Sequence, residues 1–468
     1  MSADATPSET PTPTLTPAAK VTVQDVLEEI RFEERLAEIE LRLPTTLALA
    51  KEGSMAKRNQ VRRQLYRDSE YLRVEIEERL NEHGIESEWL TSPVVAEANK
   101  KLDAVRAQLR LDAQPSSGSQ LEKVYMFARF ATFVLLFVGW FSAVFVLVPV
   151  RLLDATLKNM GVPRNYLPMD IISWGMARLI CLSAGSDASA EGRENLLNLK
   201  DSVVCMFSHA SNLDGFIVNA MSPVAFKYAG KKSIFMIPFL GWASRWGFGY
   251  VAIDRSNRKR GIKSLKELAT SVNEHGNSVS ISPEGTRSKD GLLQEFKKGP
   301  FYLRDDTGKN VVPAIVFGAY ECWPPGRLFS APGKVRLSPS PRTLSTPTLS
   351  RDVCLSLSLL QTLVRFLPEF KPDASKNRNQ NRLALRRIFL DAFVADVPED
   401  IGAPADANGV LRNVFAMYLI WAITFKVVGS TLSLISFVCY VVGISWWTFM
   451  QLSLVATVGL EIFMFFTC

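Results

Sequence analysis

The sequences VVCMFSHASNLDG at residues 203–215 and SVSISPEGTRS at residues 278–288 decide the fold. Each begins with a short run of β-branched and apolar residues, which predicts a buried strand, and each then becomes polar. Comparable runs occur at residues 250–253 and 311–317. We therefore expect an α/β unit over residues 198–340, with both polar segments just beyond strand ends, where open α/β sheets bind ligands.

His209 and Asp214 are the candidate catalytic pair in the first polar segment. Histidine titrates near neutral pH, so it can accept the proton of a hydroxyl group that attacks a carbonyl. The aspartate, five residues later, is expected to bind the opposite ring nitrogen and to stabilise the imidazolium. Since neither Ser208 nor Ser211 lies in a G-x-S-x-G turn, we expect the acceptor's own hydroxyl to be the nucleophile, without an acyl-enzyme.

The second polar segment contains residues suited to binding a phosphate. Gly285 allows backbone N–H groups to approach an anion closely, Thr286 supplies a hydroxyl donor, and Arg287 supplies a forked cation. We expect Glu284 to orient either the arginine or a hydroxyl of the substrate. A plain turn with a surface ion pair is the alternative interpretation.

Composition and charge favour a membrane surface or a phosphorylated ligand as the partner. The 468 residues, 47% of them hydrophobic, predict two or three structural units. Residues 1–120 contain 16 Lys and Arg against 21 Asp and Glu, a formal charge of −5, so that residues 121–468 carry +12 and the whole chain +7. This basic remainder contains the long apolar segments, and no RNA-binding or helix-turn-helix signature accompanies it, so we expect no nucleic-acid partner.

The cysteines and histidines exclude two kinds of site. The chain has three histidines and six cysteines without a CxxC pair, so neither a zinc site nor a disulfide framework is expected. Free cysteines used as small apolar residues are typical of a reducing compartment. We therefore expect no metal and no bound cofactor. The cysteines are Cys181, Cys205, Cys322, Cys354, Cys439 and Cys468.

Three segments precede the apolar part of the chain. Residues 1–20 are rich in Ser, Thr and Pro and predict a disordered tail, with no signal or transit peptide. Residues 21–113 alternate charged and aliphatic residues at helical spacing and predict two to four amphipathic helices, with breaks near Pro44, Gly53, Gly84 and Pro93. These helices either bind a protein partner, including a second copy of the chain, or form a solubilising cap. Residues 114–124 predict a linker.

A first apolar region is expected at residues 125–185. Residues 130–150 form an unbroken run of 21 uncharged residues between Arg129 and Arg151, long enough to cross the hydrocarbon core of a bilayer. A weaker apolar stretch follows at residues 166–184. Either the first stretch spans the membrane, or both form a hairpin in one leaflet, and we favour the hairpin.

The carboxy-terminal part of the chain predicts a connector and a second membrane region. Residues 346–411 are expected to form a connector containing a basic helix at residues 382–393. Residues 412–468 are almost wholly apolar and predict two transmembrane helices joined between Gly429 and Gly443.

The motifs resemble those of the glycerolipid acyltransferase family, typified by the 1-acylglycerol-3-phosphate acyltransferases. The family's N-H-x4-D motif is matched by residues 208–214, with serine in place of the usual asparagine. Its F/I-x-x-R element is matched by residues 252–255, and its F-P-E-G-T-R-S motif by residues 283–288, with Ser282 where an aromatic residue is commoner. A V-P-x-x-x strand is matched by residues 312–316.

The resemblance covers roughly residues 125–340 and implies an α/β catalytic domain, a mixed sheet flanked by helices, which we expect at residues 186–345. It implies acyl-CoA or acyl-carrier protein as the acyl donor, a co-substrate rather than a bound cofactor, and a lysophospholipid or glycerol phosphate as the acceptor. His209 and Asp214 would be the catalytic pair. The acceptor's phosphate and glycerol are expected at Arg255, Glu284, Gly285 and Arg287.

The leading hypothesis is a membrane O-acyltransferase that transfers an acyl chain from acyl-CoA to lysophosphatidic acid, giving phosphatidic acid. The alternatives are an acyltransferase for glycerol 3-phosphate or another lysophospholipid, a catalytically silent lipid-binding scaffold, and a lipid hydrolase. We expect the protein in the endoplasmic reticulum membrane with a cytosolic active site. A bacterial inner membrane is the alternative location.

Overall fold

The computed structural model describes most of the chain. The amino-terminal tail, Arg255 and the last residues of the second apolar region lie outside the described part, so the expectations for them are not addressed. The described residues are 21–115, 120–142, 144–162, 166–199, 201–237, 240–254, 257–331, 335–339, 353–357, 360–401, 407–453 and 455.

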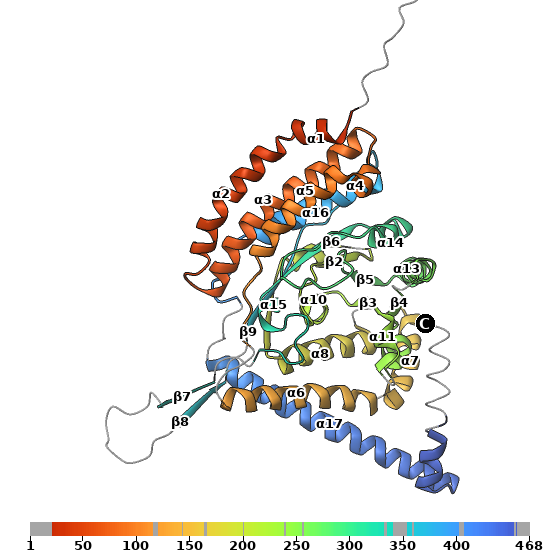
Figure 1. Cartoon of the computed structure of the whole chain (residues 1–468). Coiled ribbons are helices and arrows are strands. Elements are labelled where there is room, and N and C mark those ends of the chain that lie inside the picture. Colours follow the sequence, from red (N-terminus) through yellow and green to blue (C-terminus); the bar gives the residue numbers. More distant parts are fainter. Residues whose placement is uncertain are drawn as a thin grey trace, which may run out of the picture.

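A seven-stranded mixed sheet lies at the centre of the molecule (Figure 1), with strand order β1-β9-β6-β2-β5-β3-β4. Neighbouring strands are parallel except β6 and β9, which are antiparallel. The α/β unit expected from the sequence, with a mixed sheet flanked by helices, is therefore confirmed. The strands are β1 (Ser186–Glu191), β2 (Val204–Phe207), β3 (Phe226–Lys231), β4 (Val251–Ile253), β5 (Ser278–Ile281), β6 (Val311–Phe317) and β9 (Leu360–Phe366).

Strand β2 shows how the sequence builds the two layers around this sheet. Successive side chains of a strand point to opposite faces. Val204 and Met206 accordingly pack into one buried apolar cluster, and Cys205 and Phe207 pack into another. The first cluster includes residues of α13 (Arg258–Asn273), α14 (Gly299–Thr307) and α16 (Arg378–Val394), and the second includes residues of α8 (Pro168–Ser183) and α10 (Asp214–Met221). Because both faces are covered, all four residues of β2 are buried.

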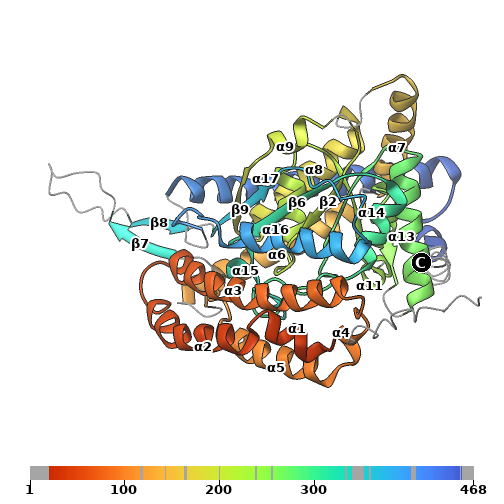
Figure 2. The ribbon, with the colours of Figure 1, turned by 90° about the horizontal axis from the view of Figure 1, so that it is seen from above.

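The amino-terminal helices share a continuous core with the sheet. In α2 the apolar residues Phe32, Leu36, Ile39 and Leu43 are buried, and they belong to the same cluster as residues of β2, β5 and α16. Figure 2 shows α16 running between α3 and the sheet, and α16 contacts both α3 and β6. The helices are α1 (Val23–Glu29), α2 (Phe32–Leu49), α3 (Met55–Glu82), α4 (Glu88–Thr91) and α5 (Pro93–Gln108).

Two expectations for this region differ from the structure. Its described part contains five helices rather than two to four. Pro44, expected to break a helix, lies inside α2, which continues to Leu49 because its apolar face is buried on both sides of the proline. The apolar face of the region packs against the rest of the chain.

The first apolar region consists of α6 (Gln120–Ser142) and α7 (Val144–Asn159), followed by α8. Arg129, expected to flank a membrane segment, is only 1% exposed. Its guanidinium donates to the carbonyls of Ser183 and Ala184 at the end of α8 and to that of Ala331. Helix α8, the second half of the expected hairpin, buries one face against the α/β unit. Helix α6, through Arg129, and helix α8, through its buried face, are therefore joined to the α/β unit.

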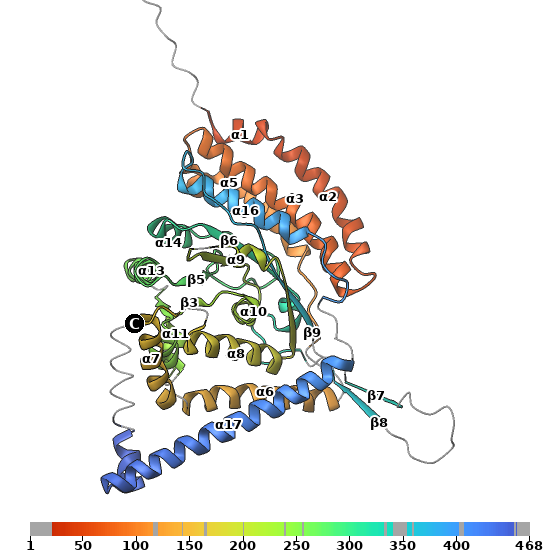
Figure 3. The same cartoon turned by 180° about the vertical axis from the view of Figure 1, so that it is seen from behind.

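The second apolar region contains two helical segments, and their junction lies at the carboxy-terminal end of the expected range. Helix α17 (Ala407–Val442) continues through Gly429, and the chain becomes helical again at Trp446. Figure 3 shows α17 lying alongside α6, and Trp421 donates to Thr132 at 3.2 Å. In the described residues no single helix is long and apolar enough to cross a membrane, whereas residues 432–442 and 446–453 meet that criterion as a pair bent by 109°.

The remaining described elements are short. Strands β7 (Val335–Pro339) and β8 (Val353–Leu357) form a separate antiparallel pair that projects beside the end of α17 in Figure 1. Strand β9 and helix α16 lie in the stretch expected as a connector, so that this stretch contributes to the sheet and to its cover. The other elements are α9 (Glu194–Leu197), α11 (Lys232–Phe235), α12 (Leu240–Trp242), the π-helix η2 (Ala243–Gly247) and α15 (Ala319–Cys322).

Candidate active site

The two polar segments of the sequence meet at one edge of the sheet. Strands β2 and β5 are parallel neighbours, so the loops after them leave the sheet side by side. The backbone N–H of Ser288 donates to the carbonyl of His209 at 2.8 Å, and the N–H of His209 donates to the carboxylate of Glu284 at the same distance. These two hydrogen bonds join the segments that contain the histidine and the expected phosphate-binding residues.

Asp214 is held rigidly beside the ring of His209. It is the first residue of α10, is 2% exposed, and its Oδ2 atom lies 3.0 Å from the Nδ1 atom of the histidine. The same oxygen accepts the backbone N–H groups of Ala210 at 2.7 Å and Ser211 at 2.6 Å. Because an ionised carboxylate only accepts hydrogen bonds, the ring must donate Nδ1–H, which leaves Nε2 as the basic nitrogen.

The ring of His209 is accessible and oriented. Its side chain is 25% exposed, and its edge packs against the ring of Phe207 with centroids 5.7 Å apart. No described residue forms a hydrogen bond with Nε2. A base with one nitrogen bound to a carboxylate and the other free can accept a proton from a bound hydroxyl group.

Glu284 supports the site from within the protein. Its side chain is 1% exposed, and its two carboxylate oxygens accept the backbone N–H groups of His209 and Gln294, each at 2.8 Å. Burial raises the pKa of the Glu284 carboxyl to about 8, although these two hydrogen bonds lower it. The carboxylate of Glu284 therefore contacts the backbone of both loops, and its expected role in orienting Arg287 or a substrate hydroxyl stays a prediction.

The other predicted residues of this loop face outward. Gly285 has φ of +71°, a left-handed conformation that favours glycine, and a side chain there would meet the Cγ atom of Lys297 at 3.3 Å. Thr286 and Arg287 follow on the exposed side of the turn. Arg255 follows β4, two strands beyond β5 in the sheet, and lies outside the described residues.

The two serines that depart from the family pattern both accept backbone hydrogen bonds. The hydroxyl of Ser208 accepts the N–H of Val316 at 2.9 Å and so joins the end of β2 to β6. The hydroxyl of Ser282 accepts the N–H of Glu284 at 3.2 Å. Both serine hydroxyls therefore help to hold the backbone of the loops in place.

The sequence did not identify several residues that hold the S-P-E-G-T-R-S segment at residues 282–288, which we call the third motif. Asp290 and Gln294 are among them. Asp290 binds Arg106 of α5, and the carbonyl of Gln294 accepts from Arg386 of α16. A polar SKDG turn directly after the motif was the available signal for Asp290. Among the described residues, no group of three or more His, Cys, Asp or Glu side chains is arranged to hold a metal ion.

Comparisons with known proteins match the same part of the chain. Residues 188–316 match the family model described as Acyltransferase. The chain is 38% identical over 136 residues to the chloroplastic 1-acyl-sn-glycerol-3-phosphate acyltransferase of Arabidopsis thaliana, which covers 29% of this chain and 37% of that protein. The 1-acyl-sn-glycerol-3-phosphate acyltransferase of Saccharomyces cerevisiae is 34% identical over 137 residues, 29% of this chain and 44% of the yeast protein. The chain therefore spans less than half the length of either relative.

Among solved structures, the 1-acyl-sn-glycerophosphate acyltransferase PlsC from Thermotoga maritima is similar. The TM-score is 0.44 and the sequence identity is 18%. The similarity covers 59% of this chain and 99% of that chain.

Proposed function

Because residues 188–316 match the family model described as Acyltransferase, we propose that the protein is a glycerolipid acyltransferase that transfers a fatty acyl group from acyl-CoA to the free hydroxyl of a lysophospholipid. The acceptor is 1-acylglycerol-3-phosphate, and the product is phosphatidic acid. The name shared by the relatives supports this acceptor. The observation that carries the proposal is the 3.0 Å contact between His209 Nδ1 and Asp214 Oδ2.

In the proposed reaction, His209 acts as a general base and then as a general acid. Its Nε2 atom takes the proton of the acceptor hydroxyl as the oxygen attacks the thioester carbonyl, forming a C–O bond. When the tetrahedral intermediate collapses, the C–S bond breaks, and Nε2–H returns the proton to the sulfur of CoA. Asp214 stabilises the imidazolium between these steps through its charge and its contact with Nδ1. No acyl-enzyme is formed.

We assign binding of the acceptor to the exposed part of the third-motif loop. Arg287 pairs with the phosphate, because a guanidinium matches a phosphate with two parallel hydrogen bonds. Thr286 and the backbone of Gly285 supply further donors on the same turn, and Arg255 contributes a second positive charge. Glu284 contributes by holding the loop against His209.

The protein is proposed to act at a membrane, because both the acceptor and the acyl chain are lipids. Large apolar side chains are exposed on α17 and the helix after it, and a contiguous exposed apolar surface is typical of a lipid or protein contact. The endoplasmic reticulum is the proposed location, and a bacterial inner membrane is the alternative. Fractionation of the cells that make the protein would show in which membrane it lies. The exposed side chains include Tyr418, Phe425, Phe437, Tyr440 and Trp447.

The test uses the full chain purified in detergent and incubated with labelled oleoyl-CoA and a panel of lysophospholipids and glycerol 3-phosphate. Labelled phosphatidic acid supports the proposal, free fatty acid indicates a hydrolase, and the absence of any product indicates a scaffold. His209→Ala should lower the rate by roughly two to four orders of magnitude. His275→Ala is the matched control, because His275 is exposed just beyond the end of α13.

A further inference from the structure

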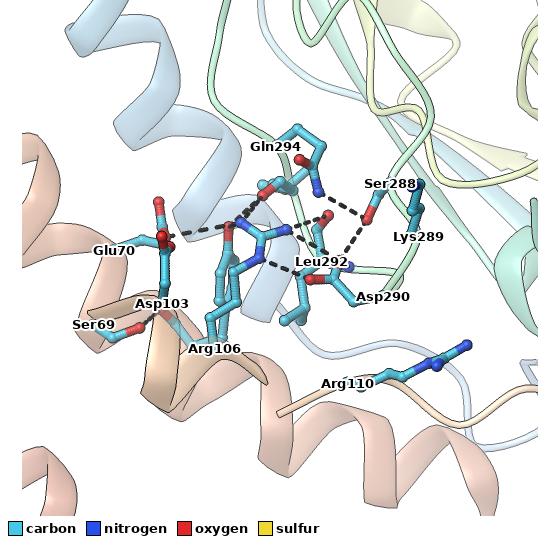
Figure 4. A network of polar contacts seen from close by, with 12 residues as sticks. Ser69, Glu70, Asp103, Arg106, Arg110, Ser288, Lys289, Asp290, Leu292 and Gln294 are labelled. Atoms are coloured by element: carbon cyan, nitrogen blue, oxygen red, sulfur yellow. Dashed lines mark hydrogen bonds and ion pairs between the residues drawn. The ribbon is translucent and has the colours of Figure 1, made fainter. Parts of the chain in front are cut away.

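The segment directly after the third motif is bound by a helix from outside the matched part of the chain. Arg106 of α5 donates two hydrogen bonds to the carboxylate of Asp290, from Nε at 2.8 Å and from Nη2 at 3.0 Å (Figure 4). A two-point contact of this kind fixes both the distance and the orientation of the partner. The same carboxylate accepts the hydroxyl of Ser288 at 2.6 Å and the N–H of Leu292 at 3.1 Å.

The environment of the Asp290 carboxyl favours its charged form, although the group is largely buried. Burial opposes its ionisation, but the hydrogen bonds and charge of Arg106 and the donors Ser288 and Leu292 together lower the pKa of Asp290. Ser288 also donates its N–H to the carbonyl of His209. Arg106 is therefore connected to the loop that contains His209 through Asp290 and Ser288.

Further contacts from the amino-terminal helices bind the backbone of this segment. Arg106 donates to the carbonyl of Leu293 at 3.0 Å, and the hydroxyl of Tyr66 donates to the same carbonyl. The N–H of Leu111 donates to the carbonyl of Asp290 at 2.9 Å. This approach requires Gly291, whose φ is +82°, since a side chain there would meet Leu111 at 3.0 Å.

A second arginine connects the helices to Glu284. Arg386 of α16 forms an ion pair with Glu70 of α3, and it also donates to the carbonyl of Gln294. The N–H of Gln294 donates to Glu284, which in turn accepts the N–H of His209. Glu70 and Arg386 are each 2% exposed. Buried ion pairs of this kind contribute little net stability but specify geometry, because breaking one leaves an unpaired buried charge.

We propose that Arg106 and Arg386 are positioning residues for the acylation reaction, which hold the third-motif loop at a fixed distance from His209. Both act through other residues and lie outside residues 188–316, so the amino-terminal helices and α16 form part of the catalytic unit. The inference rests on the proposed function for its kinetic test. Its direct consequence, the order of the loop, is measured without substrate.

The kinetic test compares Arg106→Met with Lys101→Met, a control on the same helix whose side chain pairs with Glu33 at the surface. Arg106→Met should raise KM for the lysophospholipid or lower kcat by roughly 10- to 100-fold, with KM for acyl-CoA unchanged, because small displacements of positioned groups have effects of that size. Arg106→Lys should recover part of the loss, since it keeps the charge without the two-point contact. Lys101→Met should have native kinetics.

A purely structural role predicts a different result. If activity falls only in proportion to the folded fraction, with both KM values native, or if folded Arg106→Met has native kinetics, the proposal is overturned. Asp290→Asn, which keeps the shape of the side chain, replaces Arg106→Met if that variant does not fold.

Amide hydrogen exchange separates this inference from the proposed function. In Arg106→Met, peptides covering residues 284–294 and the N–H of His209 should exchange faster than in the native protein, while α10 is unchanged. Unchanged exchange at residues 284–294 overturns the inference. Faster exchange in a protein that acylates no lysophospholipid supports the inference and rejects the proposed function.

Discussion

The backbone N–H of His209 donates to the carboxylate of Glu284 at 2.8 Å, so the loop that contains His209 and the third-motif loop are joined by a buried acid. Burial raises the pKa of this acid to about 8. Its pKa in the unfolded chain is about 4.3. The folded state therefore binds one more proton than the unfolded state between these values, and stability falls as the pH rises through that range.

Glu284→Gln should flatten this dependence, because glutamine has nearly the shape of the protonated acid and carries no titrating group. Because of this group, the free energy of unfolding of the native protein should fall by roughly a few kcal/mol between pH 4.5 and pH 8. Thermal unfolding in detergent at pH 5 and pH 8.5 measures the difference. Glu295→Gln is the control. Glu295 is exposed and pairs with Lys297 at the surface, so this variant should keep the pH dependence of the native protein. Equal slopes for native protein and Glu284→Gln would contradict the assignment.

Asp214→Asn should remove the negative charge beside His209 while keeping the geometry of their contact. An amide oxygen in the place of Oδ2 can still accept from Ala210, Ser211 and His209. Without the negative charge the imidazolium is less stable, so we expect kcat to fall by roughly two to four orders of magnitude with an unchanged melting temperature. Steady-state kinetics with saturating acceptor measure kcat. A native kcat would exclude the general-base mechanism.

Arg287→Ala should selectively weaken binding of the phosphorylated acceptor. Loss of a charge-assisted hydrogen-bonded pair costs about 1.5–3 kcal/mol, which corresponds to a roughly 10- to 100-fold higher KM for 1-acylglycerol-3-phosphate. A monoacylglycerol lacks the phosphate, so any slow reaction with it should not change. Lys289→Ala, at an exposed lysine two residues later, is the control. A higher KM for acyl-CoA alone would instead assign Arg287 to the donor.

Strands β2, β4, β5 and β6 could be predicted from the sequence, whereas β1, β3 and β9 could not. Strands β2 and β6 are short runs of buried apolar residues, with valine and isoleucine prominent in β6, and all four residues of β5 are buried, which is the pattern of strands covered on both faces. Strand β1 reads SDASAE, and it exists because it pairs with β9, more than 170 residues later. Pairing between distant segments has no local signal, and strand propensity depends on such context.

The same division holds for the candidate site. His209 and Asp214 could be paired from their spacing, because the turn after β2 and the first residue of α10 bring them together. Arg106 and Arg386 could not be assigned, because their contacts with Asp290 and Gln294 cross 184 and 92 residues. In the sequence they are ordinary charged residues of amphipathic helices.

Gly285→Ala should separate the strain of a left-handed residue from its effect on the site. Both Gly285 and Gly276 have positive φ, +71° and +61°, so alanine at either position costs about 1–2 kcal/mol of stability. A side chain at Gly285 also meets Lys297 at 3.3 Å, whereas nothing lies within 4 Å of one at Gly276. The two variants should therefore have similar melting temperatures, but only Gly285→Ala should raise KM for the acceptor. Equal acceptor KM values in both variants would mean that the turn at Gly285 does not position the phosphate-binding residues.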